Sequence, residues 1–582
     1  MRRILWMGLG IIALAAGCSA PDPENTADLI IHNGRVYTFH WGEPAPDGTP
    51  ASDAPHTASG WSPDAEAVGV KDGEILFVGS NADVERYRGS DTEVMDVGGA
   101  TVLPGLIDSH THVIGLGQLE VQINLIGVGT EEEAVQRVID AVDASGGIDE
   151  TEWILARGWD EGAWATNYPT WDRLSEAFPD NPVIMDSLHS FAVWGNKKAF
   201  QAAGITRDTP DPEGGEILRD ADGNPTGVVL NRAGQLLKSA VPEPSDEQFK
   251  SYILAGLNRM ATDGYVSVHE AGVDSRFMTA LEELEAADEL PIRVYAMISA
   301  RDGELCRRWI EKGPVTDNER MLITRSVKAY YDGALGSRGA RLLEDYSDRP
   351  GHKGVAGGEY GFDMELVAEL MRAGFQVAIH AIGDAGNRET LDFLTSVVEA
   401  DPETRELRHR IEHAQVIHPD DFERFSELNL IASMEPAHCA EDKTWAEDRL
   451  GSQRVKGAYA WRTLRQAGAR LAFNSDLIGS DHNIFYGLHS AITRRDKNLE
   501  PPEGWYPEES MTPEEAVRGY TIWGAYAGSL ENEMGTLEVG KWADITVMDI
   551  DPLVVGDTEP GKLFDGNIVA TIVGGRVLYK AE

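Results

Sequence analysis

The sequence predicts an α/β protein with a (β/α)8 TIM barrel, an inserted subdomain and a small sheet domain built from both chain ends. Three observations predict this fold class. The centre of the chain alternates short apolar runs with helix-like segments, and eight strand candidates can be counted. Both ends are rich in short strands with tight turns. Several central strands end in His, Lys or Asp, and barrel active sites lie at such strand ends.

The chain has 582 residues, so two or three domains are expected. Its formal net charge of −46 excludes a nucleic-acid partner, because binding to phosphates needs clustered Lys and Arg. The acidic residues are spread along the chain, which favours a solvated surface over an acidic substrate-binding surface. The oligomeric state is left open.

Residues 1–17 are predicted to be a signal peptide. Two arginines precede the apolar run Ile4–Ala16, which is too short to span a bilayer as a mature helix. The run ends in Leu14-Ala-Ala-Gly-Cys18, which resembles a bacterial lipoprotein signal. Ordinary secretory cleavage, with Cys18 incidental, is the alternative.

Cleavage before Cys18 would leave this residue as the lipid-bearing N-terminus, followed by a tether over residues 18–27. Ser19, rather than Asp, follows the cysteine, which favours the periplasmic face of the outer membrane in a bacterial cell envelope. We therefore expect the protein to contact a membrane through this lipid anchor.

Residues 28–103 and 533–582 are predicted to form one small sheet domain. Asn33-Gly34 and Asp72-Gly73 are hairpin signals between short strands of the first segment. The second segment shows the same pattern of short strands, with strand-like runs that begin at Ala543 and Ile568.

Residues 104–532 are predicted to form the barrel. A closed (β/α) barrel requires eight parallel strands. The candidates are Thr101–Asp108, Tyr265–His269, Ile292–Ile298, Leu322–Tyr330, Phe375–His380, His409–His413, Leu428–Met434 and Arg470–Asn474.

A long interruption, residues 115–240, separates the first two strands and concentrates aromatic side chains. One interpretation is a subdomain that packs these aromatics in its own core. The other is a lid or wall over the barrel mouth that shapes an apolar substrate pocket, with Trp159 and His189 as substrate contacts.

Six residues at strand ends predict a two-metal hydrolase site. His110 and His112 lie two apart, so both side chains point to the same side of their strand and can bind one ion. Imidazole and carboxylate groups suit zinc and similar divalent ions. The other four residues are Lys328, His380, His413 and Asp476.

Two further histidines are expected to face the mouth of the barrel. His269 ends the second predicted strand, and His438 follows the seventh. Each is expected either to contact the substrate or to make local hydrogen bonds.

The motifs resemble the amidohydrolase superfamily, and within it the amidohydrolase-3 branch that includes N-substituted formamide deformylases. The resemblance covers nearly everything after the tether. It rests on Val102-Leu-Pro-Gly-Leu-Ile-Asp-Ser-His-Thr-His, Lys328-Ala-Tyr-Tyr-Asp-Gly-Ala-Leu-Gly-Ser-Arg, His380-Ala-Ile-Gly-Asp, Arg410-Ile-Glu-His-Ala-Gln and Gly535-Thr-Leu-Glu-Val-Gly-Lys-Trp-Ala-Asp-Ile.

This resemblance implies a composite β-sandwich beside the barrel and two divalent ions, with Zn²⁺ as the expected metal. A free ammonium group cannot bind a cation, so the resemblance implies that Lys328 is carboxylated. The alternative is a lysine inside the barrel paired with a carboxylate such as Asp332, which would favour a single ion. The resemblance assigns one ion to His110 and His112, the second to His380 and His413, the bridge to Lys328, and a contact with the first ion to Asp476.

The eighth strand departs from the pattern of the family, which usually shows Gly-Ser-Asp there. This strand ends in Asn474-Ser-Asp476, and Gly479-Ser-Asp481 follows in the loop. Asp476 is the expected ligand because it directly follows the apolar strand.

The expected activity is hydrolysis of a non-peptide C–N bond in a small molecule, foremost an N-substituted amide or formamide. A hydroxide bridging the metals would attack, and Asp476 would act first as general base and then as general acid. One alternative is a deaminase or cyclic amidase with the same centre. Another is a catalytically silent, lipid-anchored binding protein.

Overall fold

The computed structural model describes residues 26–149, 152–160, 164, 168–187, 192–212 and 214–581. The predicted signal peptide, Cys18 and His189 lie outside these residues. None of the described helices is long and apolar enough to cross a membrane.

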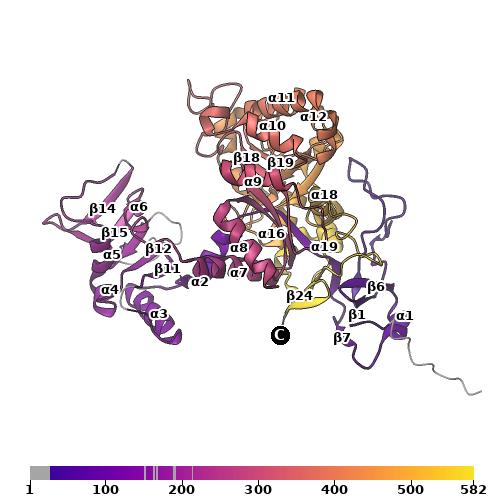
Figure 1. The fold of residues 1–582 in the computed structure, drawn as a ribbon, viewed down its shortest axis with the longest axis horizontal. Helices are drawn as coiled ribbons and strands as arrows, with labels where there is room; N and C mark the ends of the chain where they lie inside the picture. Colours follow the sequence, from indigo (N-terminus) through magenta and orange to yellow (C-terminus); the bar gives the residue numbers. More distant parts are fainter. Residues whose placement is uncertain are drawn as a thin grey trace, which may run out of the picture.

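Eight parallel strands form a nearly closed barrel in the centre of the molecule (Figure 1), which confirms the predicted fold class. At the seam between the first and last strands, the Ser109 hydroxyl donates to the Phe473 carbonyl oxygen at 2.9 Å, and Thr111 bridges to Leu477. The strands are β9 (Leu106–Thr111), β16 (Tyr265–Val273), β17 (Arg293–Ser299), β18 (Leu322–Tyr330), β19 (Gln376–Ala381), β20 (Arg410–His413), β21 (Ile431–Met434) and β22 (Arg470–Phe473).

Helices follow most of the barrel strands, as expected for βα units. The principal ones are α8 (Ser275–Ala286), α9 (Gly303–Lys312), α10 (Met364–Arg372), α11 (Asp384–Ala400), α12 (Phe422–Glu427) and α15 (Trp461–Gln466). The other helices of this half are α13 (Pro436–Asp442), α14 (Ala446–Arg454), α16 (Ile484–Thr493), α17 (Pro513–Gly519), α18 (Ile522–Ala527) and α19 (Pro552–Thr558).

Two small sheets lie beside the barrel, one built from the N-terminal end of the chain and the other from both ends (Figure 1). Strand β23 from the C-terminal end pairs antiparallel with β8 from the N-terminal end, and one apolar core includes Val102 and Ile545. One sheet contains β6 (Glu74–Gly79), β5 (Ala67–Lys71), β1 (Leu29–His32) and β7 (Glu93–Asp96). The other contains β2 (Arg35–Val36), β8 (Thr101–Pro104), β23 (Ile545–Met548), β24 (Ile568–Val573) and β25 (Arg576–Lys580).

The structure tests three local predictions in this region. Asp72-Gly73 forms the predicted hairpin between β5 and β6, with φ angles of 50° and 85°. The hairpin predicted at Asn33-Gly34 is wrong, because β1 and β2 lie in different sheets. The predicted strand Thr101–Asp108 is divided between two strands, because the chain passes from one sheet to another at Gly105. A Cβ atom at Gly105 would lie 2.4 Å from the Val266 side chain, so a larger residue would not fit there.

The segment between β9 and β16 forms a lobe to one side of the barrel (Figure 1, left). Helix α2 (Val113–Val121) leads out to it and α7 (Asp246–Thr262) returns. The two helices touch at Gly117, where a Cβ atom would lie 1.7 Å from the Tyr252 carbonyl oxygen. The elements of the lobe are β10 (Ile123–Asn124), β11 (Ile154–Trp159), β12 (Val183–Ser187), β13 (Ala192–Gly195), β14 (Gly215–Arg219), β15 (Pro225–Asn231), α3 (Glu131–Ala144), α4 (Trp171–Ala177), α5 (Lys197–Ala202) and α6 (Gly234–Lys238).

Candidate metal centre

The six predicted ligand residues line one pocket at the carboxyl ends of the barrel strands, with a volume of about 450 Å³. They come from five strands that lie far apart in the sequence. His110 lies in β9 and His112 directly after it, Lys328 in β18, His380 in β19, His413 at the end of β20, and Asp476 just after β22.

A first cluster of donor atoms is formed by His110, His112 and Asp476. The Asp476 Oδ1 atom lies 3.2 Å from His112 Nε2 and 3.7 Å from His110 Nε2. Donor atoms of all three residues lie within 4.8 Å of one another, close enough to bind one ion. Asp481 lies away from this cluster, pairs with Lys497 and accepts the Asn483 backbone N–H at 2.9 Å.

A second cluster surrounds His413. Its ring centre lies 4.5 Å from that of His380, and His380 Nε2 is buried without a hydrogen-bond partner in the described part of the chain. Donor atoms of His413, His438 and Asp476 also lie within 4.8 Å of one another. His438 lines the pocket, as predicted for a mouth residue. Its donor atom also lies close enough to those of His413 and Asp476 to bind the same ion.

Lys328 is buried between the two clusters. Its Nζ donates to His110 Nε2 at 3.0 Å, and no carboxylate oxygen of the described residues lies within 4.0 Å of it. The alternative pairing with Asp332 is wrong, because that carboxylate accepts backbone N–H groups, including those of Ile382 and Gly383 at 2.9 Å. Burial lowers the pKa of Lys328 to about 8, although nearby Glu412 and Asp476 oppose this shift.

A buried ion pair beneath His110 was missed by sequence reasoning. The His110 Nδ1 donates to Glu412, which also accepts two hydrogen bonds from Arg410 at 2.7 and 2.9 Å. Burial, followed by the charge of Lys328, lowers the pKa of His110 to about 4, so the ring is neutral near pH 7. Its Nε2 lone pair therefore faces the cluster. The available signal was two opposite charges, two residues apart, in a short strand whose four residues are all buried.

Of the two roles expected for His269, the structure supports local hydrogen bonding and not substrate contact. Strand β16 continues to Val273, so His269 lies in the middle of the strand and is 1% exposed. Its Nδ1 accepts a hydrogen bond from Arg410 at 2.9 Å, and its ring packs on Tyr295. This histidine belongs to the barrel interior beneath the pocket.

The prediction that Trp159 contacts the substrate is also corrected. Its side chain is fully buried in the lobe, packs against Trp164 and Trp194, and donates to the Met185 carbonyl oxygen at 2.9 Å. Of the two interpretations of this segment, the core of a separate subdomain therefore accounts for Trp159. His189 lies outside the described residues.

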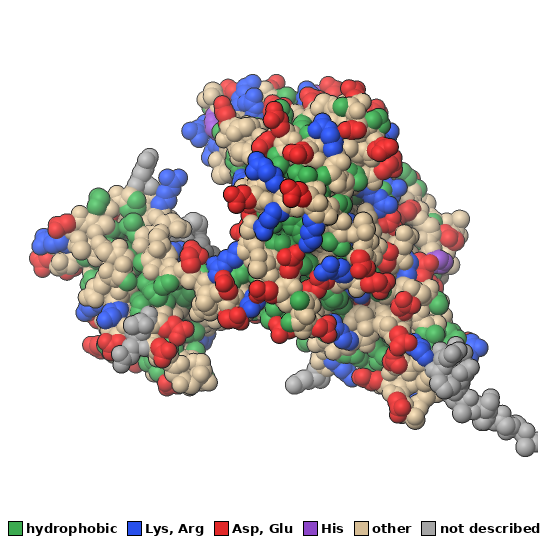
Figure 2. All heavy atoms as spheres, in the orientation of Figure 1, with side chains coloured by type: hydrophobic (Ala, Val, Ile, Leu, Met, Phe, Trp, Pro, Cys, Tyr) green, Lys and Arg blue, Asp and Glu red, His purple; other side chains and the backbone are tan. Residues whose placement is uncertain are grey.

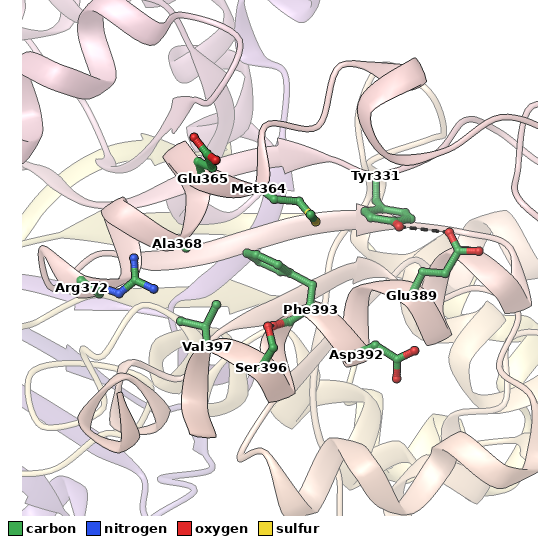
Figure 3. Close-up of a pocket in the computed structure, with 10 residues that line it drawn as sticks. All are labelled: Tyr331, Met364, Glu365, Ala368, Arg372, Glu389, Asp392, Phe393, Ser396 and Val397. Atoms are coloured by element: carbon green, nitrogen blue, oxygen red, sulfur yellow. Dashed lines mark hydrogen bonds between the residues drawn. The ribbon is translucent and has the colours of Figure 1, made fainter. Parts of the chain in front are cut away.

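Residues that follow the strand ends complete the pocket, and sequence reasoning named none of them as site residues. Trp445, Leu335 and Ile382 contribute apolar surface, and Arg301 and Tyr330 form part of another wall. A separate groove of 540 Å³ lies between α10 and α11, where the Tyr331 hydroxyl donates to Glu389 at 3.0 Å (Figure 3). It contains none of the six predicted ligands.

Comparison with known proteins agrees with this arrangement. YtcJ of Bacillus subtilis is 32% identical over 526 residues, covering 88% of this chain and 96% of YtcJ. The N-substituted formamide deformylase of Arthrobacter pascens is 27% identical, covering 89% and 95% of the two chains. The crystal structure of an uncharacterized metal-dependent hydrolase from Pyrococcus furiosus matches with a TM-score of 0.67 and 26% identity, covering 90% and 99%. The model of the amidohydrolase family designated Amidohydro_3 matches residues 93–579, and the chain therefore belongs to that family.

Proposed function

We propose that this protein is a metal-dependent hydrolase that cleaves a non-peptide C–N bond in an N-substituted amide or formamide. The observation that carries the proposal is the convergence of all six ligand-type residues on one pocket. Its volume of about 450 Å³ suits a small molecule. Similarity to the N-substituted formamide deformylase supports this substrate class.

The donor set fits two divalent ions such as Zn²⁺, since imidazoles and a carboxylate are suitable ligands. We infer that His110, His112 and Asp476 hold one ion, and that His380 and His413 hold the other. Lys328 would bridge them after carboxylation. A pKa of about 8 supports this step, because part of the population then has the neutral amine that reacts with CO₂.

When bound, the ions supply a water molecule of lowered pKa and polarise the scissile carbonyl group. The Asp476 carboxylate accepts the proton of that water and returns it to the departing nitrogen. Burial opposes ionisation of Asp476, but the hydrogen bond with His112 and the proximity of His110 outweigh it. The pKa of Asp476 is therefore held well below its usual range, and the group is ionised near pH 7, as a general base must be.

Metal analysis of the purified protein, followed by a panel of N-acyl and N-formyl amines, tests this proposal. We expect about two ions per chain, release of free amine, loss of activity on chelation and recovery with Zn²⁺. Release of ammonia or ring opening, with no cleavage of open-chain amides, would instead favour a deaminase or cyclic amidase. A metal-loaded protein that turns over none of these compounds would favour a silent binding protein.

We also propose a lipid anchor at Cys18, on the sequence pattern alone. Stable anchoring requires more than one acyl chain, as bacterial lipoproteins have. The Cys18→Ala variant should therefore leave the membrane fraction. Unchanged fractionation of this variant would contradict the anchor.

A further inference from the structure

Arg301 stands out among the residues that line the pocket of the candidate metal centre. It follows β17, and among the described lining residues only Arg301 and Lys328 are lysine or arginine. Its side chain makes no hydrogen bond or ion pair with any described residue. In a chain with 97 acidic and 51 basic residues, an arginine without a carboxylate partner in a functional pocket needs an explanation.

The guanidinium group of Arg301 makes cation–π contacts with two aromatic rings. Its central carbon lies 3.9 Å from the ring centre of Tyr330 and 5.7 Å from that of Tyr360. Arg301 is exposed, and such cation–π contacts favour this position of its guanidinium while leaving its N–H donors free for a ligand. The guanidinium is thus preorganised for a ligand that accepts hydrogen bonds.

The same tyrosine connects Arg301 to the candidate metal centre. Lys328 Nζ lies 5.2 Å from the ring centre of Tyr330, so the side chains of Arg301 and Lys328 both lie close to this ring. A small molecule whose reacting bond lies at the Lys328 end can therefore reach Arg301 with a group only a few bonds away.

Two acidic residues that line the pocket belong to α13. Glu441 and Asp442, in α13, already accept hydrogen bonds from Ser480 and Tyr459, respectively. They would repel an anion placed near α13. An anionic group of a ligand is therefore expected at Arg301 rather than beside α13.

We propose that Arg301 binds a carboxylate of the substrate, and that the substrate is an N-substituted amide with a carboxylate a few bonds from the scissile bond. Planar, bidentate pairing suits guanidinium and carboxylate groups. This inference rests on the proposed amidohydrolase function. The carboxylate can lie on the amine side, as in an N-acyl amino acid, or on the acyl side, as in a succinamic acid.

Paired substrates separate these cases. On the amine side, N-acetyl-leucine is compared with neutral N-acetyl-leucinol. On the acyl side, N-butylsuccinamic acid is compared with neutral N-butylbutanamide. Each is assayed by amine release with the metal-loaded full chain, in the wild type and in Arg301→Gln, Arg301→Lys and Arg307→Gln. Arg307 is the matched control, since it is exposed on α9 and does not line the pocket.

We expect the wild type to prefer the acid in one pair by at least about tenfold, the value of one charged hydrogen bond. Arg301→Gln should lower kcat/KM for that acid about 10- to 100-fold, mainly through KM, and change the neutral partner less than about threefold. Arg301→Lys should recover part of the loss, and Arg307→Gln should behave as the wild type.

Two results overturn the inference while the proposed function stands: no preference for either acid, or an equal loss on acid and neutral compounds in Arg301→Gln. Cleavage of none of the four compounds by the metal-loaded wild type would overturn the inference and count against the proposed amide hydrolysis as well.

Discussion

His110 shows how single side chains prepare the pocket for a metal. Its Nδ1 proton is donated to Glu412, and Arg410 holds that carboxylate with two hydrogen bonds. The ring is thus fixed in one tautomer and orientation, with Nε2 directed toward Asp476 and Lys328. Glu412 therefore acts as a positioning residue for a ligand.

The Glu412→Gln variant tests this role. Gln removes the negative charge from beneath His110 and leaves Arg410 unpaired in the interior. We expect about 10- to 100-fold weaker metal binding and a loss of about 3–5 kcal/mol in stability. Chelator competition and thermal unfolding measure the two effects, with Glu423→Gln on the exposed face of α12 as control. Metal affinity equal to that of the wild type would contradict the positioning role.

Asp476 and Asp481 provide a second test at this scale. Asp476→Asn should lower kcat about 10²- to 10⁴-fold, because an amide cannot accept and return the proton. Asp481→Asn removes an exposed partner of Lys497 and should leave kcat unchanged. If the Asp481 variant lost activity and the Asp476 variant kept it, the assignment at the eighth strand would be wrong.

At the scale of elements, the lobe and the candidate metal centre share a helix. His112 is the residue from which α2 starts, and α2 packs against α7 through Gly117 and Gly256. A Cβ atom on Gly256 would lie 2.2 Å from the Val113 carbonyl oxygen, so larger residues would force the two helices apart. The helices that carry the lobe therefore contact Val113, which directly follows the predicted metal ligand His112.

Substitution of two tryptophans tests whether the lobe affects the stability of the protein or the binding of the substrate. Trp159→Ala should destabilise the lobe by about 3–5 kcal/mol and leave KM nearly unchanged, because the side chain is fully buried away from the pocket. Trp445→Ala should raise KM, because this half-buried side chain lines the pocket. Thermal unfolding measures the stability of both variants, and steady-state kinetics measure their KM. A raised KM with unchanged stability in Trp159→Ala would restore the lid interpretation.

For the whole molecule, the sequence predicted the barrel because periodic apolar runs report strands directly. All eight strands are present, and the six ligand-type residues meet at their carboxyl ends. The error at His269 came from the length of β16, which no local signal marks. The Arg410–Glu412 pair and Arg301 were missed because their roles depend on contacts between distant segments.

The direction of the lobe was equally beyond sequence reasoning, since it depends on how α2 and α7 leave the barrel. The acidic character of the chain is easier to interpret. Figure 2 shows acidic and basic side chains interspersed over the visible face, in keeping with a solvated surface.

Lys328 is proposed to join two metal ions in one hydrolytic centre. The most direct test is the metal-to-protein ratio of the wild type and Lys328→Ala, measured together with hydrolysis. We expect about two ions in the wild type, loss of at least one ion in the variant, and loss of nearly all its activity. Short carboxylic acids in excess should restore part of the metal content and part of the activity of the variant, by taking the place of the carboxylated lysine between the ions. An unchanged ratio in the variant, with reduced stability alone, would contradict the bridge and favour a mononuclear hydrolase.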